Sequence, residues 1–393
     1  MLFTISIIIP LYKGGKYIPS LIKMAKENKK MARKYFEISL ELVFVNDFPE
    51  ERIIYNFLQE KESEIDIKLI ENKDNLGIHR SRVNGMNCAK GEYIIFLDQD
   101  DYIKKEYLCE QIKYICGKDA VLCNGIKEYF CQSRKRMIFM SYQAQIESVK
   151  MDTLINKGNY IISPGQMMIK KSCIPSIWTN NWILSNGADD LFLWILMAQN
   201  EISYGFCTSL LYVHRSHGDN VSNDYVTMTN SLLEMVKYLS DNKVLNEKYK
   251  LALNNRIYNE KKEIRINELN DIYDKWLYLK INGINLASYF EKKKFFNIAI
   301  YGMGQLGCRF YEDISSQNIR VLYAIDKNAD AIFICGIKII TLECELIKEY
   351  LAQVDVVVVT VTDGFLVNEI EREIKQLKDI PVVSLNEVIT SLL

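Results

Sequence analysis

The sequence of 393 residues lacks the long apolar runs, paired cysteines and charge excess that mark several classes of protein. No stretch approaches the roughly 18 apolar residues of a membrane-spanning helix, so any membrane contact is expected to be peripheral. The net charge is −1 and basic residues are interspersed with acidic ones, which argues against nucleic acid as a partner. The ten cysteines include no C-x-x-C pair and no zinc-like spacing. They are expected to be small core residues of a protein in the reducing cytoplasm.

The N-terminal segment MLFTISIIIPLYKGG has no basic region before its apolar run and no small-residue cleavage site after it. It is therefore expected to form a strand and not a signal peptide. Apolar residues make up 49% of the chain and charged residues 25%, which is typical of a globular protein with a large core. The length favours two domains, or one large domain with an appendage.

Apolar runs alternate with helical segments through the first 100 residues. The runs lie at 5–10, 40–47, 65–72 and 93–98, and the helical segments near 16–35, 50–63 and 77–89. Strands that are apolar throughout and separated by helices predict a mostly parallel sheet covered on both faces. Ligands bind such sheets at the carboxyl ends of the strands. The residues expected at those ends are Pro10, Asn46, Asp47 and Asp98.

The rest of the chain predicts two further parts. Residues 102–222 continue the first domain, with helices near 104–116 and 189–199 and strands near 119–124, 137–141, 166–170 and 206–213. Residues 223–293 are charged, with apolar residues at helical spacing, and are interpreted as a helical connector. Residues 294–393 begin a second alternation of strands and helices, which predicts a small C-terminal α/β domain.

The segment GEYIIFLDQDD delivers three carboxylates at the end of a buried strand. Side chains alternate along an extended chain, so Asp98 and Asp100 are expected on the same side. Two carboxylates suit Mg²⁺ or Mn²⁺, which leaves coordination positions for phosphate oxygens. The alternative is that DQDD is an N-terminal cap cluster for the helix that follows.

The order of the motifs over residues 4–222 resembles glycosyltransferase family 2, whose members have the GT-A fold. In that family a strand ending in Pro is followed by a strand ending in a D-D-G-S-like turn, an N-x-G-x-x-x-A-R-N-x-G segment and a G-x-Y-[IL]-x-F-L-D-x-D-D strand. The third segment is matched by Asn75, Gly77, Arg82 and Gly85, and the fourth by Gly91, Tyr93, Phe96, Leu97, Asp98, Asp100 and Asp101. Each motif is weak alone, but the ordered set is specific.

The resemblance implies a role for several residues. Those implied for donor binding are Pro10, Tyr12, Asp47, Asn75, Arg82 and Asp98. Those implied for the metal are Asp100, Asp98 and His217, the last within a segment similar to the family's Y-x-x-R-x-H-x-x-N-x-S ending. Asp190 is implied as the general base, with Asp189 as its neighbour or alternate, because the family carries a Glu-Asp pair there. N-terminal capping of the helix after Asp190 is the alternative reading of this pair.

Two segments depart from the family pattern. Asn46 replaces the first acid of the D-D-G-S turn, and Phe48 and Pro49 stand where Gly-Ser is usual. Lys13, Gly14 and Gly15 stand where the family often has Asn-x-Glu. The identity of the donor base is therefore left open.

The segment YGMGQLG carries Gly302, Gly304 and Gly307 between a predicted strand and a predicted helix, and Asp326 ends the next strand. This is the fingerprint of a dinucleotide site in a Rossmann-like domain, with the acid directed to ribose hydroxyls. The alternative is a scaffolding or oligomerisation domain in which the glycines only allow strand and helix to pack.

The sequence as a whole predicts an α/β protein with a GT-A domain at 1–222, a helical connector at 223–293 and a Rossmann-like domain at 294–393. The expected function is inverting, metal-dependent transfer of a sugar, with UDP as the expected carrier, from a nucleotide-sugar donor. The expected acceptor is a hydroxyl of a glycan or of a lipid-linked acceptor in surface polysaccharide synthesis. Two alternatives are a nucleotide-sugar-binding protein without turnover and a bifunctional enzyme whose C-terminal domain binds NAD. A cytoplasmic location is expected, with peripheral membrane contact and a homo-oligomer left open.

Overall fold

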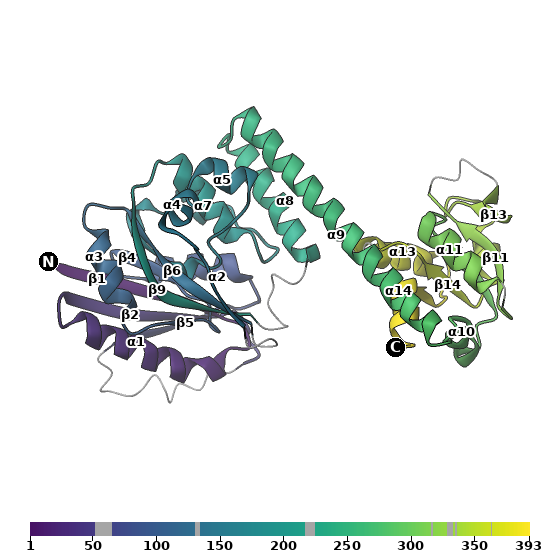
Figure 1. The fold of residues 1–393 in the computed structure, drawn as a ribbon, viewed down its shortest axis with the longest axis horizontal. Coiled ribbons are helices and arrows are strands. Elements are labelled where there is room, and N and C mark those ends of the chain that lie inside the picture. The colour runs from purple at the N-terminus through teal and green to yellow at the C-terminus, as the bar shows by residue number, and fades with distance from the viewer. Residues whose placement is uncertain are drawn as a thin grey trace. The chain divides into compact units, whose positions relative to one another are not determined.

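The computed structural model describes residues 1–51, 65–129, 134–216, 225–315, 317–327, 333–334, 336–362 and 364–393. The chain divides into two compact units, residues 1–258 and 259–393, and each has its own sheet (Figure 1). This arrangement confirms an α/β class with a separate C-terminal α/β domain. The predicted helix near 50–63 lies mostly outside the described residues.

The first unit is built on a sheet that has nine strands among the described residues. These are β1 (Leu2–Leu11), β2 (Glu37–Asn46), β3 (Asp66–Glu71), β4 (Tyr93–Phe96), β5 (Tyr102–Ile103), β6 (Ala120–Tyr129), β7 (Arg134–Met137), β8 (Met167–Lys170) and β9 (Tyr204–Ser216). Its described helices are α1 (Ile18–Ala32), α2 (Ile78–Cys88), α3 (Tyr107–Ile115), α4 (Tyr142–Glu147), α5 (Met151–Asn156), α6 (Ser176–Asn180), α7 (Asp189–Gln199) and α8 (Tyr225–Asp241). Short 3₁₀ helices lie at Gly15–Tyr17, Pro164–Gln166 and Lys171–Cys173.

The strands follow the order β3-β2-β1-β4-β8-β6-β9-β5, and β7 pairs with β6. The four strands from β3 to β4 are parallel, as predicted. Strand β8 runs antiparallel between β4 and β6, whereas β6 and β9 are parallel to each other. The sheet is therefore mostly parallel with inserted antiparallel strands. The carboxyl ends of β1, β2 and β4 meet at one edge, where the candidate site lies.

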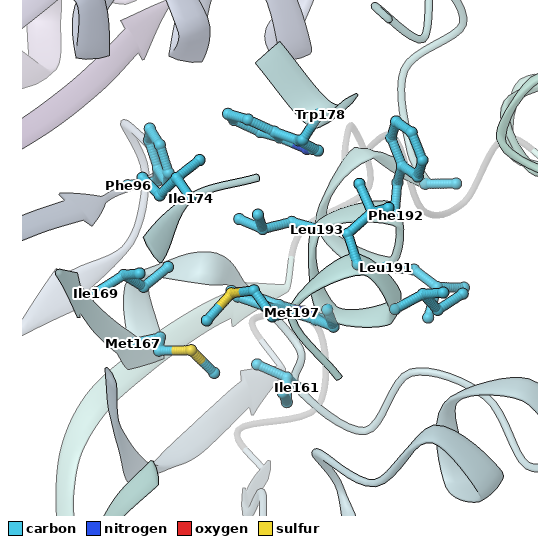
Figure 2. Packing of buried hydrophobic residues seen from close by; sticks show 14 of the residues in the cluster. Phe96, Ile161, Met167, Ile169, Ile174, Trp178, Leu191, Phe192, Leu193 and Met197 are labelled. Atoms are coloured by element: carbon cyan, nitrogen blue, oxygen red, sulfur yellow. The ribbon is translucent and has the colours of Figure 1, made fainter. Parts of the chain in front are cut away.

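Two apolar clusters cover the faces of this sheet. Helices α1 and α3 pack on one face, and α1 runs along it in Figure 1. Helices α2, α7 and α8 contribute to the cluster on the other face. Figure 2 shows Trp178 close to Phe96 in that second cluster, with ring centroids 5.4 Å apart. Because both faces are covered, the strands are apolar throughout their length and not alternately polar.

Pro10 occupies a position in β1 where its missing N–H is not needed. Strand β4 pairs with β1 only as far as Ile8, and Leu97 N donates to the Ile8 carbonyl at 2.9 Å. Pro10 lies beyond that pairing and keeps its register with Val45 of β2. A proline is tolerated in an inner strand only at such a position, so the strand end implied by the resemblance has a local structural reason.

Two of the matched glycines allow close packing. A Cβ atom added at Gly91 would lie 2.6 Å from the backbone nitrogen of Ser6 in β1. A Cβ atom added at Gly85 would lie 2.4 Å from Cγ2 of Ile8, where α2 rests on the sheet. Gly91 therefore lets the chain at the start of β4 approach β1, Gly85 lets α2 approach the sheet, and neither needs a role in ligand binding.

Replacement of Gly91 by Ala is expected to destabilise the chain. The added methyl group would meet backbone atoms of β1, which have little freedom to move, and such overpacking costs about 1–3 kcal/mol. The measurement is the midpoint of denaturant unfolding. Lys90→Ala is the control, because it changes the neighbouring residue and removes only an exposed ion pair with Asp66. Equal midpoints for the two variants would contradict the close approach.

The sequence left open whether DQDD caps a helix, and the structure excludes this alternative. The residues after Asp101 form β5, which pairs with β9. Helix α3 begins only at Tyr107, and its N-cap residue is Glu106. The carboxylates therefore lie in a loop between two strands.

The second unit contains a six-stranded sheet in its described residues, ordered β12-β13-β11-β10-β14-β15. Its strands are β10 (Asn297–Tyr301), β11 (Arg320–Ile325), β12 (Phe333–Ile334), β13 (Ile337–Ile340), β14 (Val356–Val359) and β15 (Val382–Ser384). All its pairings are parallel except that of β12 with β13. Its helices are α10 (Ala287–Lys293), α11 (Gln305–Ile314), α12 (Ile347–Leu351), α13 (Gly364–Leu377) and α14 (Leu385–Thr390).

The segment interpreted as a connector takes part in both cores. Leu232, Met235 and Leu239 of α8 are buried in the first unit. Helix α9 (Glu247–Ile281) crosses the boundary between the units, and its Trp276 and Leu279 are buried in the second. The division at residues 222 and 293 stays a prediction. Within the described residues, none of the helices combines the length and apolar character needed to cross a membrane.

Candidate active site

Asp47 fixes the loop that leads into α2. Its Oδ1 accepts hydrogen bonds from Leu76 N and from Asn72 Nδ2, both at 2.8 Å. Its Oδ2 accepts from Gly77 N at 2.9 Å, where the backbone has a φ of +83°. Asp47 is buried, so these three bonds satisfy a carboxylate that water cannot reach. The residue implied for base binding thus also shapes the segment that contains Asn75.

Asn75 lies at the start of this shaped segment and is exposed. Its Oδ1 accepts from Gly77 N at 3.1 Å, which closes a short local turn. The neighbouring Asn72 is buried and holds α2 through Ser81 and Asn84. These contacts hold the loop before α2 beside the ends of β1 and β2.

Tyr12 and Phe48 form an aromatic pair at the ends of β1 and β2. Their ring centroids are 5.2 Å apart in an edge-to-face arrangement. The Lys13 ammonium lies 5.1 Å from the centroid of the Phe48 ring. Gln99 holds the Tyr12 backbone at both its N–H and its carbonyl, at 3.0 and 3.1 Å. The departures from the family pattern at Lys13 and Phe48 therefore lie together, beside the residue implied for donor binding.

Arg82 joins two carboxylates that are far apart in the sequence. Its Nη2 donates to Asp98 Oδ1 at 2.5 Å, and its Nη1 donates to Asp189 Oδ2. The side chains of Arg82 and Asp189 are each only 4% exposed. Burial alone would lower the pKa of Arg82, but the charges of Asp189 and Asp98 outweigh it and raise the pKa above its usual value. The arginine is therefore a permanent cation between the loop after β4 and the start of α7.

Asp189 and Asp190 occupy the first turn of α7, but neither is its N-cap residue. The N-cap is Ala188, without a side-chain cap bond, and the Asp189 carbonyl accepts from Trp178 Nε1 at 2.8 Å. Negative charge in a first helical turn is favoured by the helix dipole. The Asp189 carboxylate, however, is directed to Arg82 and not to the helix amides. Asp189 thus links α7 to α2.

Asp190 has the electrostatics expected of a general base. Burial raises the pKa of its carboxyl to about 7, and the neighbouring charge of Asp189 adds to this effect. Oδ1 accepts from Leu191 N at 2.6 Å, and Oδ2 accepts from Asn159 Nδ2 at 2.9 Å. A carboxyl group with a pKa near neutrality can take up a proton during a reaction and release it afterwards.

Asp101 has a structural role. Its Oδ2 accepts from Tyr212 and from His214 Nδ1, and its Oδ1 accepts from Arg215 N at 2.9 Å. These three partners belong to β9, so Asp101 fastens the DQDD loop to that strand. Asp101 is buried, and both of its carboxylate oxygens already accept hydrogen bonds from the protein.

Asp98 and Asp100 are the other two carboxylates of the DQDD loop. Asp98 Oδ1 accepts from Arg82 Nη2, and its Oδ2 accepts from a neutral hydroxyl donor, Ser163 Oγ, at 2.8 Å. One or two carboxylates are the usual protein ligands of Mg²⁺ when substrate phosphates complete the coordination. In the part of the chain that the structure describes, no three His, Cys, Asp or Glu side chains gather around one point. His217, the third implied ligand, lies outside the described residues.

The tryptophans near the site serve packing. Trp178 and Trp194 are each 1% exposed, so neither can stack on a sugar. Trp182 is half-buried, and the Arg80 guanidinium lies 3.9 Å from the centroid of its ring. His79 is buried beside Trp178, and burial lowers its pKa to about 4. It holds the 178–183 segment as a neutral imidazole.

The glycine-rich turn of the second unit has the shape predicted for it. Gly302 has a φ of +95°, and a Cβ atom at Gly307 would lie 2.0 Å from the Gly302 carbonyl oxygen. A Cβ atom at Gly304 would enter open space. Asp326 Oδ2 accepts from Met303 N at 2.9 Å, so part of this carboxylate closes the turn. Dinucleotide binding by these residues stays a prediction.

Two polar residues of the site were not identified from the sequence. Ser163 contacts Asp98, and Asn159 contacts Asp190. Both lie in the segment between α5 and the Pro164–Gln166 turn, 65 and 31 residues from their partners. No local pattern reveals such long-range contacts.

A protein-family model described as Glycosyl transferase family 2 matches residues 6–178. This range contains all of the candidate donor and metal residues of the first unit except His217. It ends before α7, so the match does not include Asp189 and Asp190.

The individual relatives described next are less than 30% identical to this chain. EpsH of Bacillus subtilis is 27% identical over 128 residues, which are 32% of this chain and 34% of that protein. TarP of Staphylococcus aureus, named a poly(ribitol-phosphate) beta-N-acetylglucosaminyltransferase, is 23% identical over 244 residues, 59% of this chain and 72% of that protein. The crystal structure of residues 1–349 of S. aureus TarS with UDP-GlcNAc aligns at 18% identity and a TM-score of 0.49, over 64% of this chain and 70% of that one. The chain spans only about a third of the length of several curated relatives, EpsH among them.

Proposed function

Residues 6–178 of this chain belong to glycosyltransferase family 2, and on that premise we propose that the first unit transfers a sugar from a nucleotide-sugar donor to an acceptor hydroxyl. The observation that carries the proposal is the Arg82 bridge. It brings Asp98, at the end of β4, next to Asp189 and therefore close to Asp190, at the start of α7. Arg82 thus joins Asp98, on the donor side, to Asp189, the residue before the acceptor-side Asp190.

The reaction follows from these positions. The acceptor hydroxyl oxygen attacks the anomeric carbon, and the bond from that carbon to the nucleotide diphosphate breaks with its electron pair on the diphosphate oxygen. The hydroxyl proton passes to Asp190, whose pKa of about 7 suits proton transfer near neutral pH. One displacement without a covalent sugar intermediate inverts the configuration at the anomeric carbon.

We infer that the donor binds at the edge formed by β1, β2 and β4. Tyr12 would face the nucleotide base beside the loop that Asp47 holds, and Asn75 and Arg82 would lie along the nucleotide. Asp100, with Asp98 beside it, would hold Mn²⁺ or Mg²⁺. Such a cation offsets the negative charge of the leaving diphosphate.

The relatives suggest which substrates to test first. TarP and TarS are named as enzymes that transfer N-acetylglucosamine to poly(ribitol-phosphate). UDP-linked sugars as donors and polyol-phosphate or other surface glycans as acceptors are therefore the leading candidates for this chain. A location at the cytoplasmic face of the membrane, where surface polymers are made, belongs to the same proposal.

A screen of nucleotide sugars by thermal unfolding tests the proposal. We expect one donor to raise the midpoint of unfolding when Mn²⁺ is present, because a ligand bound only by the native state stabilises that state. At 100 times its Kd the donor would add about 2.7 kcal/mol. The same donor should release its nucleoside diphosphate over time.

Asp100→Asn is expected to abolish the Mn²⁺-dependent part of this protection. Asp152→Asn is the matched control, since Asp152 is an exposed acid on α5 whose described partner is Asn156. If no nucleotide sugar protects or is consumed by the wild-type chain, the proposed function is wrong. Protection without turnover would favour the binding protein considered from the sequence.

A further inference from the structure

Asn159 holds the carboxylate of Asp190 in a defined orientation. Its Oδ1 accepts a hydrogen bond from Ile161 N at 3.0 Å, so the oxygen of the amide is already committed to the backbone. The Nδ2 group must therefore face the other way, and it donates to Asp190 Oδ2 at 2.9 Å. The orientation of the Asn159 amide is therefore set by its bond to the backbone of its own loop and not by Asp190.

Ser163, four residues further on, makes the equivalent contact with Asp98. Its Oγ accepts from Gly165 N at 3.3 Å, which leaves the hydroxyl proton free to be donated. It is donated to Asp98 Oδ2 at 2.8 Å. Ser163 is 1% exposed, so this bond is shielded from competing water.

These contacts close a ring of side chains around the site. Arg82 connects Asp98 with Asp189, the residue before Asp190. The 159–163 segment makes a second connection between the loop after β4 and the start of α7, through Ser163 and Asn159. A ring with two independent connections resists the displacement of either carboxylate more than one connection would.

We propose that Asn159 is a positioning residue that aims the carboxylate of Asp190 at the acceptor hydroxyl, and that the 159–163 segment sets the distance between Asp190 and Asp98. This inference rests on the proposed function of Asp190. Leu191 N occupies a lone pair of Oδ1 and Asn159 occupies one of Oδ2, which fixes the plane of the carboxylate. The remaining lone pairs can then accept a proton in only a narrow range of directions.

The carboxylate of Asp190 is oriented by Asn159 and not by a charged group. The charged groups that influence its pKa are Asp189, its neighbour on α7, Arg82 of α2 and Asp98 after β4. Arg82 donates to the other two carboxylates. A neutral donor such as Asn159 orients Asp190 without a cation that would hold it permanently ionised.

Asn159→Asp is the decisive variant, since it has the same shape and can still accept from Ile161 N. It replaces the donated N–H by a second carboxylate oxygen, so the two acids must share a proton. We expect kcat at pH 7 to fall about 10- to 100-fold, as for the loss of a hydrogen bond to a charged group. The acid limb of the kcat profile should move to higher pH, while KM for the donor stays within about twofold. Asn159→Ala, which removes the donated N–H but adds no charge, should lower kcat with a smaller shift of the acid limb.

Asn156→Asp is the matched control. Asn156 Nδ2 donates to Asp152 Oδ1 at 2.8 Å, which is the same pair of groups at an exposed position on α5. This variant should keep the kcat and the pH profile of the wild-type chain. If Asn159→Asp also keeps both, the proposed role of Asn159 is wrong.

A measurement without substrate separates this inference from the proposed function. The thermal midpoint of Asn159→Asp, relative to the wild type, should fall as the pH rises through 7. The two facing carboxyls have a pKa in the folded chain above that in the unfolded chain, so their stability is lost as they ionise. If the thermal midpoint of Asn159→Asp changes with pH in the same way as that of Asn156→Asp, the contact with Asp190 is absent and the inference fails. If the wild type consumes no donor, the proposed function fails, and the midpoints still decide whether this contact exists.

Discussion

Asp190→Asn is expected to lower kcat by about 10²- to 10⁴-fold, because the amide cannot take the proton of the acceptor hydroxyl. Binding of the donor should remain close to that of the wild type, since Asp190 lies on the acceptor side of the Arg82 bridge. The side chain keeps its shape, and its oxygen can still accept from Leu191 N. Transfer rates and donor protection, measured on the same preparation, separate the two effects.

The pH dependence of the wild type follows from the same residue. Burial and the charge of Asp189 raise the pKa of Asp190 to about 7, so the ionised base is the minor form below that pH. We expect kcat to rise about tenfold per pH unit below 7 and to level off above it. The residual kcat of Asp190→Asn should not show this rise with pH below 7.

Asp152→Asn serves as the control for Asp190→Asn. It removes a carboxylate of the same kind from the first unit, at an exposed position on α5. Its kcat should equal that of the wild type. Retention of kcat within about threefold by Asp190→Asn would assign the base elsewhere, with Asp189 the first alternative.

Arg82→Met is expected to cost the most stability of the substitutions considered. It leaves Asp189 buried without a cation, and breaking one partner of a buried ion pair costs roughly 3–5 kcal/mol. The substitution also removes the hydrogen bond to Asp98. The rise in thermal midpoint that the donor causes should therefore disappear, in addition to the loss of stability of the chain. Denaturant unfolding measures the first effect and the thermal shift with donor and Mn²⁺ measures the second.

Two further variants show whether the bridge itself matters. Arg82→Lys keeps the charge, but one ammonium group cannot reproduce the fork that reaches Asp98 and Asp189 together. We expect it to recover part of the stability and little of the donor binding. Arg80→Met, on the same helix, removes only a cation–π contact with Trp182 and should cost about 0.5–1 kcal/mol. Equal losses for Arg82→Met and Arg80→Met would contradict the importance of the bridge.

The sequence by itself determined the elements and the residue types of the site. The parallel strands β1 to β4, and the loop of carboxylates after β4, follow from local patterns of apolar residues and their spacing. The pair at Asp189 and Asp190, at the start of a predicted apolar helix, was implied by the resemblance to the family's Glu-Asp pair. Such patterns are readable because an element of 5 to 15 residues repeats its period several times.

Only the tertiary structure decided what each of these acids contacts. Asp101 accepts hydrogen bonds from β9, Asp189 is paired with Arg82, and Asp190 accepts a hydrogen bond from Asn159. The partners lie 114, 107 and 31 residues away along the chain. The same holds for the antiparallel insertion of β8, whose neighbours β4 and β6 both precede it. A hydrogen bond depends on position and direction in space, and a single contact between distant residues leaves no periodic trace in the sequence.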